Sequence, residues 1–317
     1  MFKNHIKSLI GAGAAVAMML GTVAADAKPK QITIFTSLAG SSWYGIGAGM
    51  AEIFGSEGVN SSPELGAAFS NIANVAAGKG EMGLTMLPAI SVAANGTAPF
   101  KSPITNVKVV AALSESYMHI AVNADKGINS VADLKGKPFV TQPPGAITAL
   151  LFEEVLAANG LSTDALQLSR GSLDVQLGEM KDRRADGMVS VATFPAAFIA
   201  ELSSAMPVKL LPVDDAAFEA INAKLPAVGR STIPANTYEG QAEPVETISA
   251  KMVAVVPADM SDEDAYWIAK TLVENLEKMR TLHGSYRTLN AEAMATVPDT
   301  MLHAGAEKFY RESGALK

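Results

Sequence analysis

The stretch TSLAGSSWYGIGAGM, residues 36–50, places hydroxyl groups and glycine backbone between a β-branched run and a helix-like pattern. Ser37, Gly40, Ser41 and Ser42 would expose N–H and hydroxyl donors beside a helix N-terminus. Oriented donors and the positive end of a helix dipole stabilise a carboxylate at such a place. We therefore interpret this loop as a candidate anion-binding element. A solvated connecting loop is the alternative.

Two aromatic residues, Trp43 and Tyr44, follow these donors. Both could pack in the core at the start of the helix, as most aromatic side chains do. Tyr44 could instead offer its hydroxyl to a ligand while its ring excludes water, and we favour that role. Gly45, Gly47 and Gly49 resemble a dinucleotide fingerprint, but they lie within the helical pattern and not at the strand–helix turn. The sequence therefore disfavours nucleotide binding.

Signatures of catalysis and of metal binding are missing from the sequence. His119, His283 and His303 form no H-x-x-x-H pattern and have no neighbouring carboxylate pair, so we expect no metal site. His119 precedes a strand pattern and is interpreted as a packed or edge histidine. The chain has no cysteine, which excludes disulfides and thiolate nucleophiles. We predict no cofactor and no enzymatic activity.

The charge balance and the N-terminus bear on partners and location. The 317-residue chain carries 25 basic and 32 acidic residues, a formal net charge of −7, which argues against nucleic acid as a partner. Residues 1–27 combine Lys3 and Lys7 with an apolar, small-residue run and the motif ADA, the pattern of a cleavable signal peptide. A membrane anchor is the alternative for this segment. We predict export to the periplasm, where the mature chain is a monomer.

The rest of the chain alternates short β-branched runs with amphipathic stretches, which indicates an α/β fold. After the opening loop, Ile46, Met50, Ile53 and Phe54 recur on one helical face. The candidate strands are residues 31–36, 82–87, 107–114, 119–124, 137–141, 187–191, 208–213 and 251–257.

A second copy of the strand–loop–helix arrangement follows later in the chain. The run PFVT leads into the loop QPPG and then a helical pattern that ends at Gly160. Each copy is followed by another helix and a small-residue strand. This parallel predicts two α/β lobes that face one another across a ligand cleft. After a segment rich in turn residues, the strand pattern 251–257 and the helices to the end are typical of a return to the first lobe. We predict that lobe I comprises residues 28–126 and 249–317, and lobe II residues 127–248.

At this point the sequence resembles the TAXI-type solute receptors of tripartite ATP-independent periplasmic (TRAP) transporters. The resemblance covers the whole mature chain and lies in TSLAGSSWYGIGAGMAEIF, GKGEMGLT, GINSVADLKGKPFV, EEVLAANGL, FPAAFIAEL, STIPANTYEGQ and LHAGAEKFYRESG, in this order. It implies a two-lobed, type II-like periplasmic binding protein that closes over a small organic anion. The receptor then presents the anion to the cation-coupled membrane subunits of a TRAP permease.

Individual positions are carried over from the resemblance. Tyr44 matches the second aromatic residue of the family's Gly-rich loop, Asn71 the Asn after its Gly-Gly-Ser turn, and Thr148 the Thr of its second-lobe turn. The predicted ligand-binding residues are Ser37, Ser41, Ser42, Tyr44, Asn71, Met86, Gly145, Thr148 and Thr193.

Other positions of the family pattern have lost their polar groups. The apolar residues that stand at these positions are Ala68, Met86, Leu87, Ala146 and Ile147. The family's usual ligands are glutamate, 2-oxoglutarate and similar dicarboxylates. The losses instead favour a ligand with one anionic end and a less polar remainder.

Two further functions remain open at this stage. The same fold could report a ligand to a membrane signalling protein, in which case a histidine kinase would be encoded nearby. An enzyme on this fold is the third possibility, but no clustered acid, base, nucleophile or metal set supports it.

Overall fold

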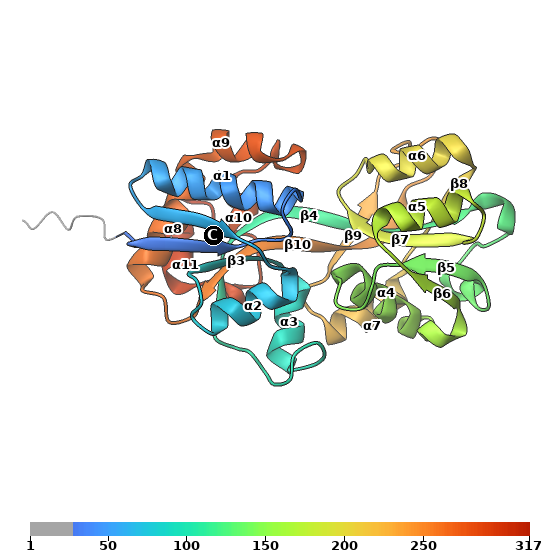
Figure 1. Ribbon diagram of the computed structural model, residues 1–317, viewed down its shortest axis with the longest axis horizontal. Helices are drawn as coiled ribbons and strands as arrows, with labels where there is room; N and C mark the ends of the chain where they lie inside the picture. Colours follow the sequence, from blue (N-terminus) through green and yellow to red (C-terminus); the bar gives the residue numbers. More distant parts are fainter. Residues whose placement is uncertain (1–27) are drawn as a thin grey trace, which may run out of the picture.

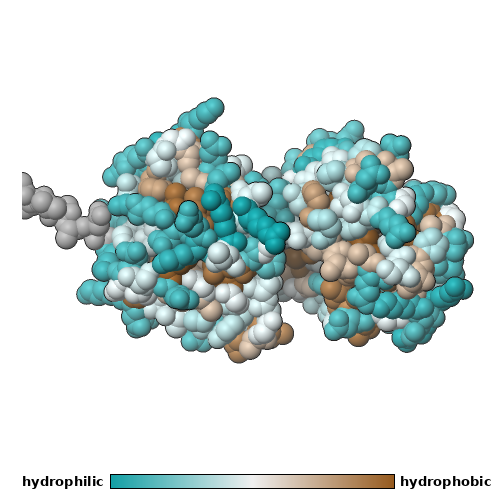
Figure 2. Space-filling view, turned by 90° about the horizontal axis from the view of Figure 1, so that it is seen from above, coloured by the Kyte–Doolittle hydropathy of each residue, from teal (hydrophilic) through white to brown (hydrophobic). Residues whose placement is uncertain are grey.

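The computed structural model describes residues 28–317, and the predicted signal peptide lies outside the described residues. The molecule is elongated, with two bodies joined by long strands (Figure 1). A narrow waist separates the two bodies in the perpendicular view (Figure 2). No helix within residues 28–317 is long and apolar enough to cross a membrane.

Ten strands form one sheet in the order β2-β1-β3-β10-β4-β7-β5-β6, with β8 paired to β4 and β9 to β10. The strands are β1 (Gln31–Phe35), β2 (Asn60–Glu64), β3 (Met82–Met86), β4 (Val107–Asn123), β5 (Pro138–Thr141), β6 (Gln167–Arg170), β7 (Gly187–Ala192), β8 (Val208–Leu211), β9 (Gly229–Ile233) and β10 (Val245–Pro257).

The helices cover both faces of this sheet (Figure 1). They are α1 (Ser42–Ser56), α2 (Ala68–Ala76), α3 (Leu87–Asn95), α4 (Ile147–Ala158), α5 (Leu173–Lys181), α6 (Ala197–Ala205), α7 (Asp215–Lys224), α8 (Asp262–Glu274), α9 (Leu276–Leu282), α10 (Ala291–Ala295) and α11 (Ala304–Glu312). The strand and helix alternation confirms the α/β fold predicted from the sequence.

The first body, lobe I, is built on the parallel strands β1, β2 and β3. Helices α1 and α9 lie on one face of its sheet, and α2 and α3 lie on the other (Figure 1). The predicted apolar face of α1 is confirmed, since Ile46, Met50, Ile53 and Phe54 are all buried. Their burial removes apolar surface from water and fixes α1 over β1.

The second body, lobe II, is built on the parallel strands β5, β6 and β7. Helices α4 and α7 cover one face, and α5 and α6 cover the other (Figure 1). Phe139 of β5 stacks on Phe152 of α4 with ring centroids 4.8 Å apart. Val140, the next strand residue, packs among residues of α5 and α6 instead, as the alternation of side chains along a strand requires.

Strands β4 and β10 run through both bodies and connect them. Residues 107–117 of β4 pair with residues 249–257 of β10, and residues 117–123 pair with β7 and β8. The predicted separate strands 107–114 and 119–124 are therefore one strand, because the polar residues between them continue the ladder. Where only a few segments connect two bodies, as β4 and β10 do here, these segments act as the hinge of domain motion.

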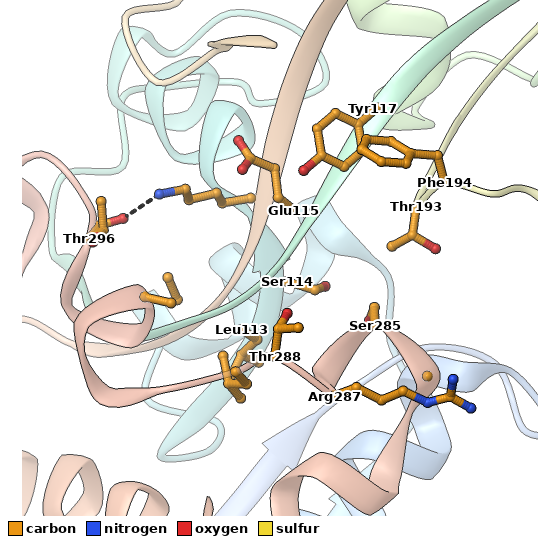
Figure 3. Close-up of a pocket in the computed structure, with 15 residues that line it drawn as sticks. Leu113, Ser114, Glu115, Tyr117, Thr193, Phe194, Ser285, Arg287, Thr288 and Thr296 are labelled. Atoms are coloured by element: carbon orange, nitrogen blue, oxygen red, sulfur yellow. Dashed lines mark hydrogen bonds between the residues drawn. The ribbon is translucent and has the colours of Figure 1, made fainter. Parts of the chain in front are cut away.

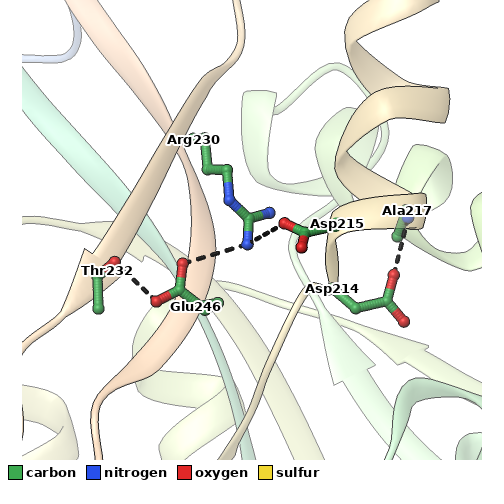
Figure 4. A network of polar contacts seen from close by, with 6 residues as sticks. All are labelled: Asp214, Asp215, Ala217, Arg230, Thr232 and Glu246. Carbon is green, nitrogen blue, oxygen red and sulfur yellow. Dashed lines mark hydrogen bonds and ion pairs between the residues drawn. The ribbon is translucent and has the colours of Figure 1, made fainter.

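The lobe II half of β10 is tied to its surroundings by a charged network (Figure 4). Arg230 of β9 forms ion pairs with Asp215 of α7 at 2.5 Å and with Glu246 of β10 at 3.3 Å. Thr232 donates a hydrogen bond to the same Glu246 carboxylate, and the Asp214 carboxylate accepts from the Ala217 N–H to cap α7. The network fixes β9, β10 and α7 as one unit on the lobe II side of the crossing.

Candidate functional site

The strand directions decide which ends of the two lobes meet. Strand β4 runs from lobe I to lobe II, and β10 runs back antiparallel to it. Strand β3 is antiparallel to β10, so β1, β2 and β3 all point their carboxyl ends toward lobe II. Strand β7 is antiparallel to β4, so β5, β6 and β7 point their carboxyl ends toward lobe I. Six strand-to-helix connections therefore face one another across the waist.

Four of the six helices that begin at these connections have no side-chain cap. Helix N-termini leave several N–H groups without an intrahelical partner, and these groups carry a partial positive charge. In helices α2, α3, α4 and α6, the residue at the N-cap accepts no backbone N–H through its side chain. These N-cap residues are Ala67, Met86, Ala146 and Ala196. The waist is therefore lined by helix ends that favour an anion.

The other two helices, α1 and α5, are capped by their own serines. Ser41 Oγ accepts from the Tyr44 N–H at 3.2 Å, and the hydroxyl of Ser172 accepts from the Val175 N–H at 3.5 Å. The sequence predicted Ser41 as a ligand donor, but its oxygen already serves α1. Ser37 is half-buried on the loop that follows the carboxyl end of β1, and the exposed Ser42 and half-buried Tyr44 lie in the first turn of α1. Their contact with a ligand remains a prediction.

Asn71 has a structural role in place of the predicted ligand contact. Its side chain is fully buried, and its amide nitrogen donates to the carbonyls of Thr36 and Leu84 at 2.7 Å and of Phe35 at 3.2 Å. Its carbonyl oxygen accepts from the Ala67 N–H at 3.1 Å. An amide group has two N–H donors, so none is left over. Asn71 joins the ends of β1 and β3 to α2.

Met86 is also buried, with 3 % of its surface exposed, at the junction of β3 and α3. Gly145 is exposed at φ +90°, a left-handed conformation that favours glycine, in the loop that leads into α4. Thr148 is buried in the first turn of α4. Of the nine predicted residues, Thr193 is the one that lines the cavity described next.

A cavity of about 610 Å³ lies at the crossing strands, between the lobes (Figure 3). Its volume is within the range of small-molecule sites. Strand β4 forms one wall, and Thr193 and Phe194 of the β7–α6 connection form the second. The third wall comes from the segment between α9 and α10 together with Ala293 of α10 and Thr296 after its end. The lining residues of β4 are Ala112, Leu113, Ser114, Glu115 and Tyr117, and those of the third segment are Gly284, Ser285, Arg287, Thr288 and Leu289. The ring of Tyr117 packs on that of Phe194 with centroids 4.4 Å apart.

Burial and the Glu115 carboxylate raise the pKa of the Tyr117 phenol, so it stays protonated.

Three charged side chains line this cavity, and sequence reasoning missed all of them. Glu115 accepts a hydrogen bond from the Ser249 hydroxyl at 2.6 Å, and the Lys251 ammonium donates to the Thr296 carbonyl at 2.8 Å. Arg287 makes no side-chain hydrogen bond or ion pair with any of residues 28–317, and its guanidinium stands free beside Ser285 (Figure 3). The available signal was the polar run SES within the apolar pattern 107–124. No sequence pattern links Arg287 to this polar run.

A buried hydrogen-bond relay holds the lobe II wall of this cavity. His119 Nδ1 lies 2.9 Å from the Tyr117 carbonyl, which only accepts, so Nδ1 carries the proton and Nε2 accepts from the Tyr238 hydroxyl at 2.7 Å. The Tyr238 oxygen in turn accepts from the Ala196 N–H at 2.9 Å. The relay fixes the connection that carries Phe194, and it confirms that His119 is a packed residue.

The stability of the protein is expected to fall as the pH drops from 6.5 to 4. Burial lowers the pKa of His119 to about 4 in the folded protein, against about 6.5 in the unfolded chain. The unfolded state therefore takes up the proton first, and the contribution of His119 is complete above pH 6.5 and is lost toward pH 4. This group accounts for roughly 2–3 kcal/mol of the difference between pH 7 and pH 4.5.

Urea unfolding of the wild type and of His119→Gln at both pH values measures this contribution. Carboxylates also titrate in this range, so the difference between the two proteins isolates His119. The variant should lose less free energy of unfolding than the wild type over the same interval. Equal losses in the two proteins would show that His119 does not titrate on unfolding.

The chain was compared with protein families and with solved structures. A family model described as NMT1-like matches residues 34–314. XAC2383 from Xanthomonas citri, solved bound to chloride ion, is 12 % identical, with a TM-score of 0.54 over 90 % of this chain and 100 % of that chain. The periplasmic aliphatic sulphonate binding protein SsuA from Escherichia coli is 15 % identical, with a TM-score of 0.49 over 92 % of this chain and 95 % of that chain. At these identities the likeness to XAC2383 shows a shared fold.

Proposed function

The chain belongs to the NMT1-like family, and we propose that it is a periplasmic solute-binding receptor. It closes over a small organic anion, a carboxylate, and delivers that anion to a membrane transporter. The single observation that carries the proposal is the set of four uncapped helix N-termini that face one another across the waist. Each offers free N–H groups and a positive dipole end, and together they hold an anion when the lobes close.

Two of the three charged side chains in the cavity at the crossing strands (below, the hinge cavity) are cationic and support an anionic ligand, whereas the third, the Glu115 carboxylate, already accepts from the Ser249 hydroxyl. The protein as a whole is acidic, with a net charge of −7, yet Arg287 and Lys251 both line this cavity. The Arg287 guanidinium has no partner among residues 28–317, and a guanidinium matches a carboxylate with two parallel hydrogen bonds. A bound carboxylate would satisfy it.

Apolar residues near the same strand ends support a ligand with a less polar remainder. The exposed large hydrophobic side chains are Leu38, Leu65 and Val175, which are 71 %, 55 % and 45 % exposed. Leu38 follows β1, Leu65 follows β2, and Val175 lies in the first turn of α5 after β6, all at the carboxyl edges. Of the predicted apolar substitutions, Ala68, Ala146 and Ile147 are partly exposed there, whereas Met86 and Leu87 are buried. The apolar surface near these strand ends therefore comes from the loops and the first turns of the helices, and not from the end of β3.

We also propose the class of membrane transporter to which the receptor delivers its ligand. The TAXI-type sequence resemblance supports a TRAP permease, which uses an ion gradient. Proteoliposomes that contain a TRAP-type permease from the same organism test that assignment directly. Uptake of the bound anion should require this receptor and a cation gradient, and it should proceed without ATP. Uptake that requires ATP would assign the receptor to a different class of transporter.

The ligand is identified by mass spectrometry of small molecules that co-purify with the protein, and a thermal-shift series then ranks analogues. Monocarboxylates with an apolar body should raise the melting temperature more than glutamate or 2-oxoglutarate, because a bound ligand stabilises the folded state. Arg287→Gln should weaken binding of the identified anion by about tenfold, the equivalent of roughly 1.4 kcal/mol. The effect should shrink at high salt.

Arg183→Gln is the matched control. Arg183 is also exposed and makes no side-chain hydrogen bond or ion pair with residues 28–317, but it precedes β7 at the end of lobe II that is remote from the waist. It should leave affinity unchanged. Equal effects of the two substitutions, or stabilisation by dicarboxylates alone, would count against the proposed ligand class.

A further inference from the structure

A second cavity, of about 480 Å³, lies on lobe II outside the waist. It is formed by α6, by β8 and by the segment 238–245 that leads into β10. Helix α6 and strand β8 adjoin each other on the upper part of lobe II (Figure 1). Apolar side chains such as Ile199 of α6 and Leu210 of β8 make up most of its wall. Its volume would accommodate a small molecule.

The loop wall of this lobe II cavity is held in place by Gln241. The Gln241 amide nitrogen donates to the carbonyls of Pro234 at 2.9 Å and of Glu243 at 3.0 Å, and its amide oxygen accepts from the Tyr238 N–H at 3.3 Å. The Gln241 carbonyl also accepts from the Asn236 N–H at 2.8 Å. Because these bonds already hold the loop in one conformation, it loses little conformational entropy when a molecule binds, and this favours affinity.

The charges around the opening favour a cation. Glu239 and Glu243 are exposed, and neither carboxylate forms a hydrogen bond or ion pair within residues 28–317. The basic residue of the wall, Lys209, donates its ammonium to the Asn129 side-chain oxygen at 2.6 Å. Two free carboxylates beside an apolar chamber match a molecule that has a positive end and an apolar body.

One wall residue, Tyr238, connects this cavity with the hinge cavity. Its ring lines the lobe II cavity, and its hydroxyl is the centre of the relay to His119 and to the Ala196 N–H. His119 bonds the carbonyl of Tyr117, which lines the hinge cavity, and Ala196 ends the connection that carries Thr193. A displacement of Tyr238 would therefore move two walls of the hinge cavity.

We propose that the lobe II cavity is a second binding site, for a small organic cation with an apolar body, and that its occupancy is coupled to the hinge cavity through Tyr238. The positive end lies between Glu239 and Glu243, and the apolar body packs on Ile199 and Leu210. The relay carries the coupling because the Tyr238 hydroxyl bonds both His119 and the Ala196 N–H, so a movement of its ring affects both bonds. An occupant that tilts the Tyr238 ring must lengthen the bond to His119 or the bond from Ala196. Binding at this site does not depend on the identity of the anion held between the lobes.

Three probes with the same body test the chemistry: 4-phenylbutylammonium, 4-phenylbutanol and 4-phenylbutanoate. Each is titrated into the full-length mature protein, and NMR follows the methyl groups of Ile199 and Leu210 and the backbone amide of Thr193. The ammonium probe should bind about tenfold more tightly than the alcohol, and the carboxylate more weakly than either. The Thr193 amide should shift in step with the Ile199 methyl. Saturating ammonium probe without a shift at Ile199, or equal binding of the carboxylate probe, would overturn the proposal.

Substitutions separate the site from its coupling. Ala242→Trp places a ring in the cavity from an exposed position and should abolish probe binding. The double variant Glu239→Gln, Glu243→Gln should remove the preference for the ammonium probe, whereas Glu219→Gln, an exposed carboxylate on α7, should not. Tyr238→Phe keeps the ring, so the probe should still bind, but the shift at Thr193 should disappear. Unchanged binding in Ala242→Trp places the probe elsewhere, and a persistent Thr193 shift in Tyr238→Phe refutes the relay. None of these readouts uses the anion, so their failure leaves the proposed receptor function standing.

Discussion

Replacing Ala146 by aspartate is expected to raise the melting temperature of the protein and to abolish its binding of the anion. Ala146 is the N-cap of α4, with φ −86° and ψ 143°, the extended conformation that a capping side chain requires. An Asp carboxylate there would accept the free N–H groups of the first turn and stabilise the fold by about 1 kcal/mol. The same carboxylate would occupy the place of the ligand's carboxylate and repel it. At a separation of about 4 Å, this repulsion is on the order of 4 kcal/mol near a protein surface, so we expect a loss of affinity of at least ~100-fold.

Thermal unfolding and titration of the identified anion measure the two effects on the same sample. Ala146→Asn caps the helix without a charge, so it should stabilise similarly and weaken binding less. Ser41→Ala removes the cap of α1, so it should lower the melting temperature and leave the affinity for the anion nearly unchanged. If Ala146→Asp is more stable but binds the anion as tightly as the wild type, the ligand does not use the N-terminus of α4.

The second large effect is expected at Asn71, where Asn71→Ala should reduce the free energy of unfolding by roughly 3 kcal/mol. The substitution removes the buried amide donor of the Thr36 and Leu84 carbonyls and the partly buried donor of the Phe35 carbonyl, whereas the Ala67 N–H keeps the Ser70 hydroxyl as an acceptor. An unsatisfied buried polar group costs about 1–3 kcal/mol, and neighbouring backbone bonds compensate for part of the loss. Urea unfolding measures the difference.

Asn106→Ala provides the matched control. The Asn106 amide also donates to a backbone carbonyl, that of Ala76 at 2.9 Å, but the bond is exposed and water replaces it. We expect this control to cost well under 1 kcal/mol. Similar losses in the two variants would mean that the buried amide network does not hold β1, β3 and α2 together. A ligand contact at Asn71, as first predicted, would instead reduce affinity and leave stability nearly unchanged.

Strands and helices were predictable from the sequence where the local hydrophobic pattern was strong. The β-branched runs at β1, β3, β5 and β7 and the apolar face of α1 were found from the sequence at nearly their structural positions. Strands β2, β6 and β9, with the sequences NSSPE, QLSR and GRSTI, were missed. Each has few β-branched or aromatic residues and lies mostly at half-buried or exposed positions, and its strand conformation comes from pairing with β1, β5 or β10. Pairing energy of this kind is set by the neighbouring strand, and the local sequence does not encode it.

The candidate site was predictable in part. The glycine- and serine-rich loop before α1 and the loop before α4 were correctly placed between a strand and a helix, because turn residues mark such connections. Whether a side chain caps each helix N-terminus was not predictable from the sequence. Ser41 turns its oxygen back onto α1, whereas Ala146, in a loop without hydroxyl groups, leaves the N-terminus of α4 without a side-chain cap. Arg287 is separated from Thr193 by a long stretch of sequence and reaches the same cavity only through the fold.

The sequence by itself determined that the chain alternates strands and helices, that two strand–loop–helix units recur, and which residues of α1 face the core. These features depend on periods of two and 3.6 residues and on interactions between near neighbours. The tertiary structure decided that β4 and β10 each run through both lobes, and that the parallel strands of the two lobes point at one another. It also decided which polar groups remain free at the waist. Those outcomes depend on contacts between residues far apart in the chain, whose geometry is fixed when the whole sheet assembles.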